Sequence, residues 1–273
     1  MLVLLPPSEG KTAGGSGPPL GRRLGLSVPD LAPARRALVS ALRTAAVHDR
    51  AALATGLQLP PGLAAAALAA DSSVTRSPTL PALDRYAGVV YAALDVATLS
   101  EAARRRAETG LLVFSGLWGV LRGGDPVPDY RVPASGTVPG LGGVTAHWRA
   151  ALAEVLPHVV GDEAVVDLRS SDYRAMWRPA GPLREQVVAV RVLAEKGTGA
   201  RRTVGPVSFH AKTVKGLLAR RLVAGRTRHR DPMAAVAAVA DALDLRVQDT
   251  STRGARSVDL VGRYTPGVVP SAE

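Results

Sequence analysis

Short apolar runs that alternate with longer helical stretches set the strongest limit on how this chain can fold. Met1–Leu5, Leu111–Phe114 and Ala164–Leu168 are too short for buried helices and suit buried strands, and Gln186–Leu193 is predicted as a fourth strand. Strands interleaved with helices indicate an α/β or α+β fold. We therefore expect one compact domain over residues 1–273, with a mixed, short-stranded sheet flanked by helices.

Helical periodicity fills most of the chain between these strands. Helices are predicted over Leu31–Ala54, Pro61–Ala70, Leu83–Leu94, Ala97–Glu108, Val144–Leu156 and Met233–Leu245. Another helix begins near Ser208, which can cap its start, and ends near Gly225. A turn at Gly197–Gly199 returns the chain into Thr203–Val207 as a hairpin, and Ser257–Val261 forms a last short strand.

Gly- and Pro-rich segments punctuate this pattern. Residues 13–25 are predicted to form a flexible loop, and residues 264–273 a tail. The stretch LQLPPGLAAA (57–66) places a Pro-Pro-Gly turn between two apolar helices, which is similar to a helix-hairpin-helix element. An ordinary helix connection is the alternative, because Ala64 stands where such hairpins usually have a second glycine.

The chain is strongly basic, with 34 Lys and Arg against 23 Asp and Glu and a formal net charge of +11. This balance favours polyanionic partners such as nucleic acid or nucleotides, and a compositional drift toward arginine is the alternative. Only four residues, Lys11, Lys196, Lys212 and Lys215, are lysines. Because a lysine amine is a compact and titratable charge, the few lysines of this arginine-rich chain are candidates for a functional role.

Composition and motifs exclude several kinds of protein. Cysteine is absent, which removes disulfides, thiolate nucleophiles, iron–sulfur clusters and zinc sites built on sulfur. The five histidines are scattered without metal-ligand spacing, so no metal or cofactor is predicted. Common motifs for serine hydrolases, nucleotide-binding loops and zinc proteases are missing.

The sequence also argues against a membrane partner. No apolar stretch reaches 18 residues, and the first residues lack the basic region and the long apolar core of a secretory signal. We expect a cytoplasmic protein.

Polar residues follow the first two predicted strands. Ser8 and Lys11 come directly after the first, and ligands of α/β folds gather at strand ends, so both could face an anion. A plain loop is the alternative.

The run Ser115-Gly116-Leu117-Trp118-Gly119 follows the second strand and leads to Arg122, Asp125 and Tyr130-Arg131. Glycine permits close approach of a ligand, and a Tyr-Arg pair can stack on a base or hold a phosphate. Alternatively, Arg122 pairs with Asp125 and Tyr130 packs in the core.

Two later segments also combine polar and apolar residues, DLRSSDY (167–173) and SFHAKTVKG (208–216). In the second, Lys212 and Lys215 are one turn apart in the first turns of a helix, where cations oppose the helix dipole. A local conflict of this kind points to a function that brings an anion to the helix. Solvated lysines on a helix flank are the alternative.

Taken in order, these segments resemble the bacterial YaaA peroxide stress protein family. The matching stretches are MLVLLPP…KT at the start, YAALDVATLS (91–100), LLVFSGLWGVLR (111–122) with Asp125 and Tyr130-Arg131, DLRSSDY, SFHAKTVKGLL (208–218) and DLVGR (259–263). They span nearly the whole chain and agree in residue type and in separation. The chain departs from the family at Asp167 and Arg169, where many members carry Asn and Ala.

The resemblance implies a cytoplasmic protein that limits peroxide damage and is linked to lower free iron. It also implies a compact single-domain α/β fold with a positively charged cleft, a helix-hairpin-helix-like element and DNA binding. The residues that match the family's polar motif positions are Arg122, Tyr130, Arg131, Ser170, Tyr173, Lys212 and Lys215. Lys11 belongs to a variant of a shorter family loop.

Two functions are compatible with these residues. The first is a DNA-binding protein of the peroxide stress response, which contacts DNA or a nucleotide-like anion through Ser8, Lys11, Arg122, Tyr130, Arg131, Ser170, Lys212 and Lys215. The second is an enzyme acting on a nucleotide, nucleoside or damaged nucleobase. There, Lys212 would be a base or nucleophile if buried beside Lys215, with Asp172 and Tyr173 as its partners. Sequestration of iron is disfavoured because no ligand set is present, and a monomer is favoured.

Overall fold

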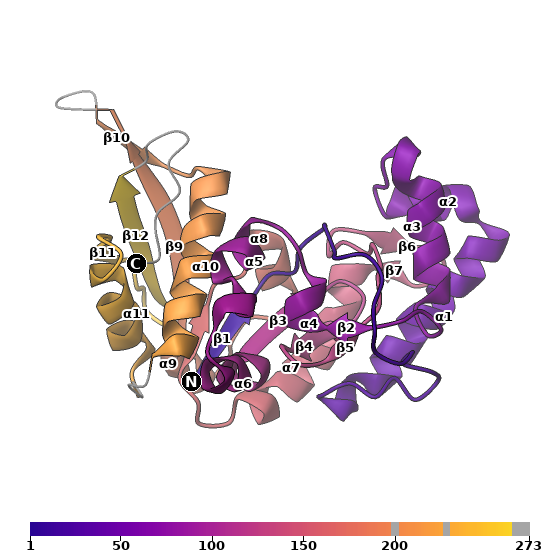
Figure 1. Ribbon diagram of the computed structural model, residues 1–273, viewed down its shortest axis with the longest axis horizontal. Coiled ribbons are helices and arrows are strands. Elements are labelled where there is room, and N and C mark those ends of the chain that lie inside the picture. Colours follow the sequence, from indigo (N-terminus) through magenta and orange to yellow (C-terminus); the bar gives the residue numbers. More distant parts are fainter. Residues whose placement is uncertain (198–201, 226–229, 264–273) are drawn as a thin grey trace.

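A mostly parallel sheet of eight strands forms the centre of the computed structural model, which describes residues 1–197, 202–225 and 230–263 (Figure 1). The strand order is β11-β12-β9-β8-β1-β3-β4, and β10 pairs with β9. The strands are β1 (Leu2–Leu5), β3 (Leu111–Ser115), β4 (Gly119–Arg122), β8 (Val165–Asp167), β9 (Val187–Lys196), β10 (Thr203–Gly205), β11 (Arg246–Asp249) and β12 (Arg256–Arg263). Two small ladders lie outside this sheet, β2 (Leu80–Pro81) with β5 (Pro126–Val127) and β6 (Thr137–Val138) with β7 (Gly142–Gly143).

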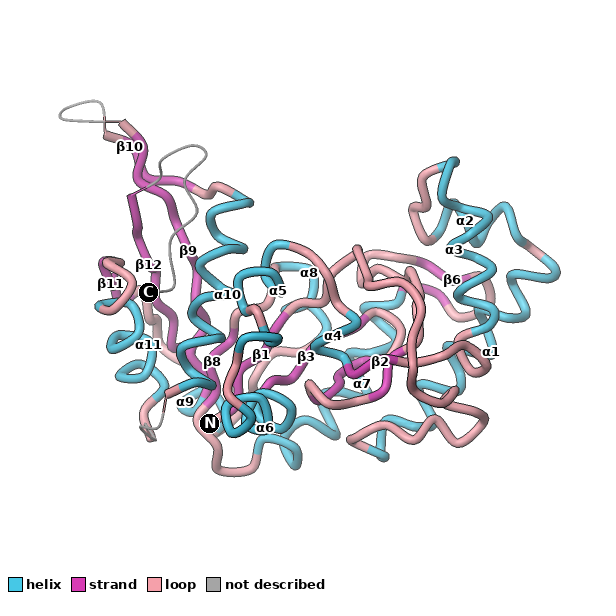
Figure 2. The backbone as a smooth tube through the Cα atoms, in the orientation of Figure 1, coloured by secondary structure: helices cyan, strands magenta, loops and turns pink. Residues whose placement is uncertain are grey.

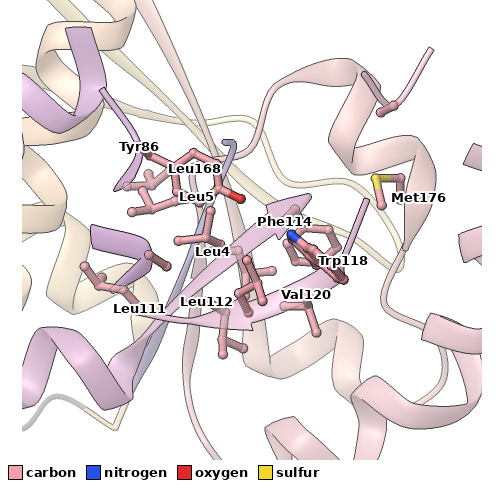
Figure 3. Close-up of a cluster of buried hydrophobic side chains, with 14 of the residues drawn as sticks. Leu4, Leu5, Tyr86, Leu111, Leu112, Phe114, Trp118, Val120, Leu168 and Met176 are labelled. Carbon is pink, nitrogen blue, oxygen red and sulfur yellow. The ribbon is translucent and has the colours of Figure 1, made fainter. Parts of the chain in front are cut away.

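The first strand lies in the middle of the sheet. β1 is parallel to β3 on one side and to β8 on the other, with Val3 opposite both Leu111 and Val166. Its residues are 6% exposed or less, and continuous apolar runs are typical of parallel strands that are covered on both faces. Figure 3 shows this part of the core, in which Leu4 and Phe114 lie among other buried apolar side chains. The four predicted strands are confirmed.

Helices precede, follow and cover the strands (Figure 2). They are α1 (Ala32–His48), α2 (Arg50–Gly56), α3 (Pro61–Ser73), α4 (Ala82–Arg85), α5 (Val89–Leu94), α6 (Glu101–Gly110), α7 (Val144–Val160), α8 (Ser171–Met176), α9 (Leu183–Gln186), α10 (Ser208–Ala224) and α11 (Pro232–Asp241), with 3-10 turns at Pro29–Leu31 and Val96–Thr98. In Figure 1, α1, α2 and α3 stand together at the end away from β11 and β12. The expected fold class is confirmed, a single compact α/β domain.

Two of the predicted helices are divided in the structure. The predicted helix over Leu31–Ala54 is divided at Asp49, whose backbone is not helical, with φ −148° and ψ 50°. The one predicted over Leu83–Leu94 is divided before α5 by Gly88, with φ 137°, a conformation that favours glycine. Between its halves, Tyr86 forms an isolated β-bridge with Lys11, and this tertiary contact overrides helix propensity.

Other differences concern turns and edges. Helix α6 extends to Gly110, two residues beyond the predicted end at Glu108. Strands β4 and β11 were not predicted, and both are antiparallel edge strands of the sheet. The predicted hairpin is confirmed as β9–β10, although most of its turn, like the predicted tail 264–273, lies outside the described residues.

The Gly- and Pro-rich segment 13–25 follows a defined course past α4. Gly17 exchanges backbone hydrogen bonds with Thr79, at 2.9 and 3.1 Å, and the buried guanidinium of Arg85 donates to the carbonyls of Thr12 and Gly14. The flexibility of this segment stays a prediction.

The Pro-Pro-Gly turn joins α2 to α3 at an angle of 106°. Of the described helices, none is by itself long and apolar enough to cross a bilayer. The bent pair of α2 and α3 meets the requirement by length and composition only.

We expect Gly216→Ala to destabilise the fold, because α10 packs directly on α5 at this glycine. A Cβ atom there would lie 2.2 Å from the Val90 carbonyl oxygen and 2.6 Å from the Ala93 Cβ. Overpacking of this kind costs about 1–3 kcal/mol of unfolding free energy. Urea denaturation would measure the loss. Gly62→Ala in α3 is the control, since a Cβ there would have no neighbouring atom within 4 Å from the rest of the described chain. Equal stabilities for the two variants would contradict the packing argument.

Candidate functional site

Three neighbouring strands, β8, β1 and β3, end at the same edge of the sheet because they are parallel. Three of the polar residues singled out in the sequence stand just beyond these strands, Ser8 and Lys11 after β1 and Ser170 after β8. In open α/β sheets, ligands bind beyond the carboxyl ends of the strands, at the point where the strand order reverses. This edge is therefore the natural place for a site.

Four of the chain's five tyrosines, Tyr86, Tyr91, Tyr130 and Tyr173, form a tyrosine cluster at this edge. The ring centroids of Tyr86 and Tyr91 are 5.4 Å apart, and those of Tyr86 and Tyr130 are 6.5 Å apart. Burial raises the pKa of Tyr86 to about 12 and that of Tyr130 well above its ordinary value. The hydroxyls therefore remain protonated near pH 7 and act as hydrogen-bonding groups rather than as bases.

A chain of buried hydroxyls links the cluster to β3. The Tyr130 hydroxyl lies 2.6 Å from the Ser115 Oγ and 2.6 Å from the Tyr86 hydroxyl. The Ser115 Oγ also accepts the amides of Leu117 and Trp118, at 3.2 and 3.0 Å. Because these amides occupy both lone pairs, the Ser115 proton goes to Tyr130 and the Tyr130 proton goes to Tyr86. The Tyr130 hydroxyl is thereby fully paired and its ring is held in place.

Lys11 lies against the face of that ring. Its Nζ is 4.3 Å from the ring centroid of Tyr130 and donates to the carbonyls of Ser8 and Glu9, both at 3.2 Å. Burial lowers the pKa of Lys11 to about 8, although the carboxylates of Asp129 and Asp71 act in the opposite direction. The amine is therefore a cation that loses its proton only slightly above neutrality.

Asp71, on α3, is the acidic counterpart of Lys11. Its side chain is buried, its Oδ1 accepts the backbone amide of Arg131 at 2.7 Å, and its Oδ2 has no hydrogen-bond partner among the described residues. Burial raises the pKa of Asp71 to about 7, against the effects of the Arg131 amide and Lys11. A carboxyl group and an amine that both titrate near neutrality are typical of functional sites, although structural networks also produce them.

Arg131 adds a second positive charge beside Asp71. Its guanidinium Nη2 lies 3.0 Å from the carboxylate of Glu9, which is largely exposed. A surface pair of this kind contributes little to stability, so an incoming anion could replace Glu9 at small cost.

On the β8 side of the edge, a buried ion pair fixes the conformation of the loop that follows β8. The Arg169 guanidinium donates to both carboxylate oxygens of Asp167, at 2.9 and 2.8 Å, and lies 4.2 Å from the ring centroid of Phe114. Burial favours the neutral acid, but the charge of Arg169 outweighs it and holds the pKa of Asp167 below its ordinary value. Asp167 and Arg169, two of the residues at which the chain departs from the resembled family, thus bind each other.

Lys215 joins this loop to α10. Its Nζ donates to the Arg169 carbonyl at 3.1 Å, and burial together with the nearby charge of Arg174 lowers the pKa of Lys215 to about 8. The positive charge of Lys215, which opposes the helix dipole, is thus partly compensated by a backbone carbonyl.

The structure gathers some of the predicted site residues and separates others. Ser8, Lys11, Tyr130 and Arg131 lie together beyond β1 and β3, and Ser170, Tyr173 and Lys215 lie beside them on the β8 side. Lys212 on α10 and Asp172 on α8 are exposed, so the burial that the enzyme hypothesis requires of Lys212 is found instead at Lys11 and Lys215.

Arg122 lies at the opposite edge of the sheet. It ends β4, which is antiparallel to β3, and its guanidinium donates to the Thr109 carbonyl. Its expected pairing with Asp125 occurs through its backbone amide, at 2.9 Å from the Asp125 Oδ2. An open hollow of about 1260 Å³ at that edge is lined by Arg106, Arg122 and Arg230 but also by Asp162 and Glu163, so its charge is mixed.

The glycines of the SGLWG run pack against protein rather than leave space for a ligand. A Cβ on Gly116 would lie 2.1 Å from the Val132 carbonyl oxygen, and one on Gly119 would lie 2.7 Å from the Trp148 ring. The expectation that these glycines admit a ligand is therefore replaced by a packing role.

Sequence reasoning missed Asp71 and Tyr86, and it placed Ser115 in a motif without giving that side chain a role. Asp71 carries a usable signal, because it is the one charged residue between Arg50 and Arg76 and stands in an otherwise apolar helix. No group of three or more His, Asp or Glu side chains in the described part of the chain is placed to hold a metal ion.

Comparison with known proteins agrees with the motifs. The family model for the peroxide stress protein YaaA matches residues 1–242. A UPF0246 protein of Streptomyces coelicolor is 43% identical over 241 residues, covering 88% of this chain and 90% of its own. UPF0246 proteins of Corynebacterium efficiens and Corynebacterium glutamicum are 38% and 37% identical, each over 81% of this chain and 84% of the relative. The chain therefore belongs to the YaaA peroxide stress protein family, which supports a role in peroxide stress.

Proposed function

We propose that this protein binds DNA as part of the peroxide stress response, and that it does so through the carboxyl edge of the sheet. The observation that carries the proposal is the gathering of Lys11, Arg131 and Lys215 beyond three neighbouring strands. Phosphate contacts from Lys and Arg supply most of the affinity of such proteins for DNA. The exposed Lys212 and the net charge of +11 support the same partner.

Further features belong to the same proposal. The turn between α2 and α3 leads into Pro61 and Gly62, the first residues of α3, and in the described part of the chain no neighbouring atom lies within 4 Å of a Cβ built on Gly62. We propose this turn as a helix-hairpin-helix-like second contact with the DNA backbone, and the edge as the basic cleft. A monomer in the cytoplasm would suffice for this function.

Duplex binding across a salt series tests the proposal. We expect a steep fall of affinity with salt, and we expect Arg131→Gln and Lys212→Ala each to flatten the log–log slope by about 0.9 for every phosphate that is no longer neutralised. Arg105→Gln is the control, since Arg105 is exposed on α6 and pairs with Glu101. An affinity independent of salt, or slopes unchanged in both variants, would contradict the proposal.

An enzyme acting on a nucleotide, nucleoside or damaged nucleobase is the second candidate. It is favoured by Lys11 and Asp71, whose pKa values of about 8 and about 7 suit acid–base chemistry near neutrality. Release of a free base or a change of mass in a panel of nucleotides and damaged duplexes would support it, provided that Lys11→Met abolishes the change. Unchanged substrates across the panel would oppose it.

A further inference from the structure

Phe209, the second residue of α10, is the one exposed aromatic residue in the described part of the chain. It is 53% exposed, whereas Tyr173 is partly buried and the other described Phe, Trp and Tyr residues are buried. An aromatic ring gains much from burial, so a ring left in solvent is available to a partner. Because single exposed apolar residues are common on protein surfaces, the groups beside this ring decide whether it has a role.

Beside Phe209 on α10 stand two of the four lysines of the chain. Lys212 follows one turn later and is exposed, and Lys215 follows three residues after that. Residues three apart are neighbours on a helix surface, so these side chains form a row along one side of α10, with about 4.5 Å of axial rise from each to the next. At the end of the row, the Lys215 Nζ donates to the Arg169 carbonyl at 3.1 Å. The row therefore runs from the exposed ring to the loop that follows β8 at the carboxyl edge of the sheet.

The charge of the segment that carries this row has a single sign. Residues 196–230 contain no Asp or Glu, while Lys and Arg recur throughout. Such a segment attracts a polyanion, and its cations can contact phosphates without the help of an aromatic ring. The ring adds a face on which a nucleic-acid base can stack. Inside an intact duplex the bases are already stacked on one another, so only an unpaired base can offer its face to Phe209.

We propose that Phe209 stacks on an unpaired base of a DNA strand whose phosphate lies on Lys212. This base-stacking subsite rests on the proposed function and deepens it, because it specifies that the DNA at this edge of the sheet includes a strand with an unpaired base. Stacking on a phenyl ring uses the face of the base and none of its hydrogen-bonding groups, so the subsite tolerates any of the four bases.

The test compares two single strands that carry the same phosphates. One is a short run of thymidine nucleotides, and the other is the same run with an abasic sugar in place of every thymidine. A duplex of the same length, whose bases are paired, is the third ligand. Fluorescence anisotropy with the full-length protein gives the affinities. We expect the strand with bases to bind about tenfold more tightly than the abasic strand, which is within the range that stacking of one base supplies.

Variants assign the preference to the ring. We expect Phe209→Ala to remove most of it and to leave binding of the abasic strand and the duplex near that of the parent, while Phe209→Trp, which can also stack, keeps it. Lys212→Ala should weaken the binding of both single strands alike. Val247→Ala, which truncates another exposed apolar side chain on the edge strand β11, is the matched control and should keep the preference. The ligand comparison needs no mutation, so it can refute the proposal even if a variant fails to fold.

The outcomes separate this inference from the proposed function. Equal affinity for the two single strands, binding of neither, or a preference that survives Phe209→Ala would overturn the base-stacking subsite, while a salt-dependent affinity for duplex DNA would still support DNA binding. An equal loss for all three ligands in Phe209→Ala would also overturn the subsite, because the ring would then act on the fold or on the sugar–phosphate backbone. A base preference that Phe209→Ala abolishes, without binding of the duplex, would support the subsite and refute the duplex contacts of the proposed function.

Discussion

Arg35→Met should lower the unfolding free energy by about 3–5 kcal/mol, as expected when one partner of a buried charged hydrogen-bond network is removed. Arg35 stands on α1 and is fully buried. Its guanidinium donates to the carbonyls of Trp118, Ser27, Val28 and Val120, at 3.0, 3.1, 3.1 and 2.7 Å. Methionine fills a similar volume but donates nothing, so three buried carbonyls and one partly buried carbonyl lose a donor at once.

Burial disfavours the charged form of this guanidinium and lowers the pKa of Arg35 to about 10, so it is still protonated near pH 7. Urea denaturation near pH 7 would measure the effect. Arg36→Met is the matched control, because Arg36 is the next residue of α1 and is exposed. A loss below 1 kcal/mol for Arg35→Met, or equal losses for the two variants, would contradict the role assigned to these hydrogen bonds.

The second large effect concerns Asp71 and pH. Its pKa is about 7 in the folded protein against an ordinary 3.8, so the folded state binds the proton more tightly. The stability that this proton supplies is complete below pH 3.8 and is lost as the pH rises to about 7. Each pH unit in this window costs about 1.4 kcal/mol, which gives a total of up to roughly 4 kcal/mol.

Asp71→Asn should remove this pH dependence. The amide oxygen can still accept the Arg131 amide, and the side chain has no charge to bury. We expect the variant to be more stable than the parent above pH 7 and to differ little from it near pH 4. The other charged groups facing Asp71 are Lys11, Asp129 and Arg131, and the lowered pKa of Lys11 acts in a separate window above pH 8.

Unfolding free energies measured at several pH values between 4 and 8 would test this prediction. Asp162→Asn serves as the exposed control and should leave the pH profile unchanged. Parallel profiles for Asp71→Asn and the parent would show that Asp71 ionises without cost in the folded protein.

The fold could be predicted where the sequence pattern is local. The apolar runs of β1, β3 and β8 are identifiable because each is buried on both sides and bounded by polar or turn residues. The edge strand β11 has no such pattern, since all four of its residues are exposed. The break at Gly88 has only a weak local signal, the glycine itself, because the bridge between Tyr86 and Lys11 that accompanies it is a tertiary contact.

The candidate site was only partly predictable for the same reason. Lys11 and Arg131 stand next to strand ends or in a recognisable motif, so their sequence position points to the sheet edge. Asp71 reaches that edge from α3, through a hydrogen bond to a residue 60 positions away. Arg122 shows the converse, since it is close to the motif in sequence and yet lies at the far end of an antiparallel strand.

The central position of β1 also has a consequence for biosynthesis. Val3 pairs with Leu111 and Val166, so the first strand leaves the ribosome long before either neighbour exists. At about 5–20 residues per second, the wait for β3 alone is roughly 5–20 s. During that interval the run LVLL is an unpaired apolar segment, and a chaperone that recognises short hydrophobic stretches would have a binding site there.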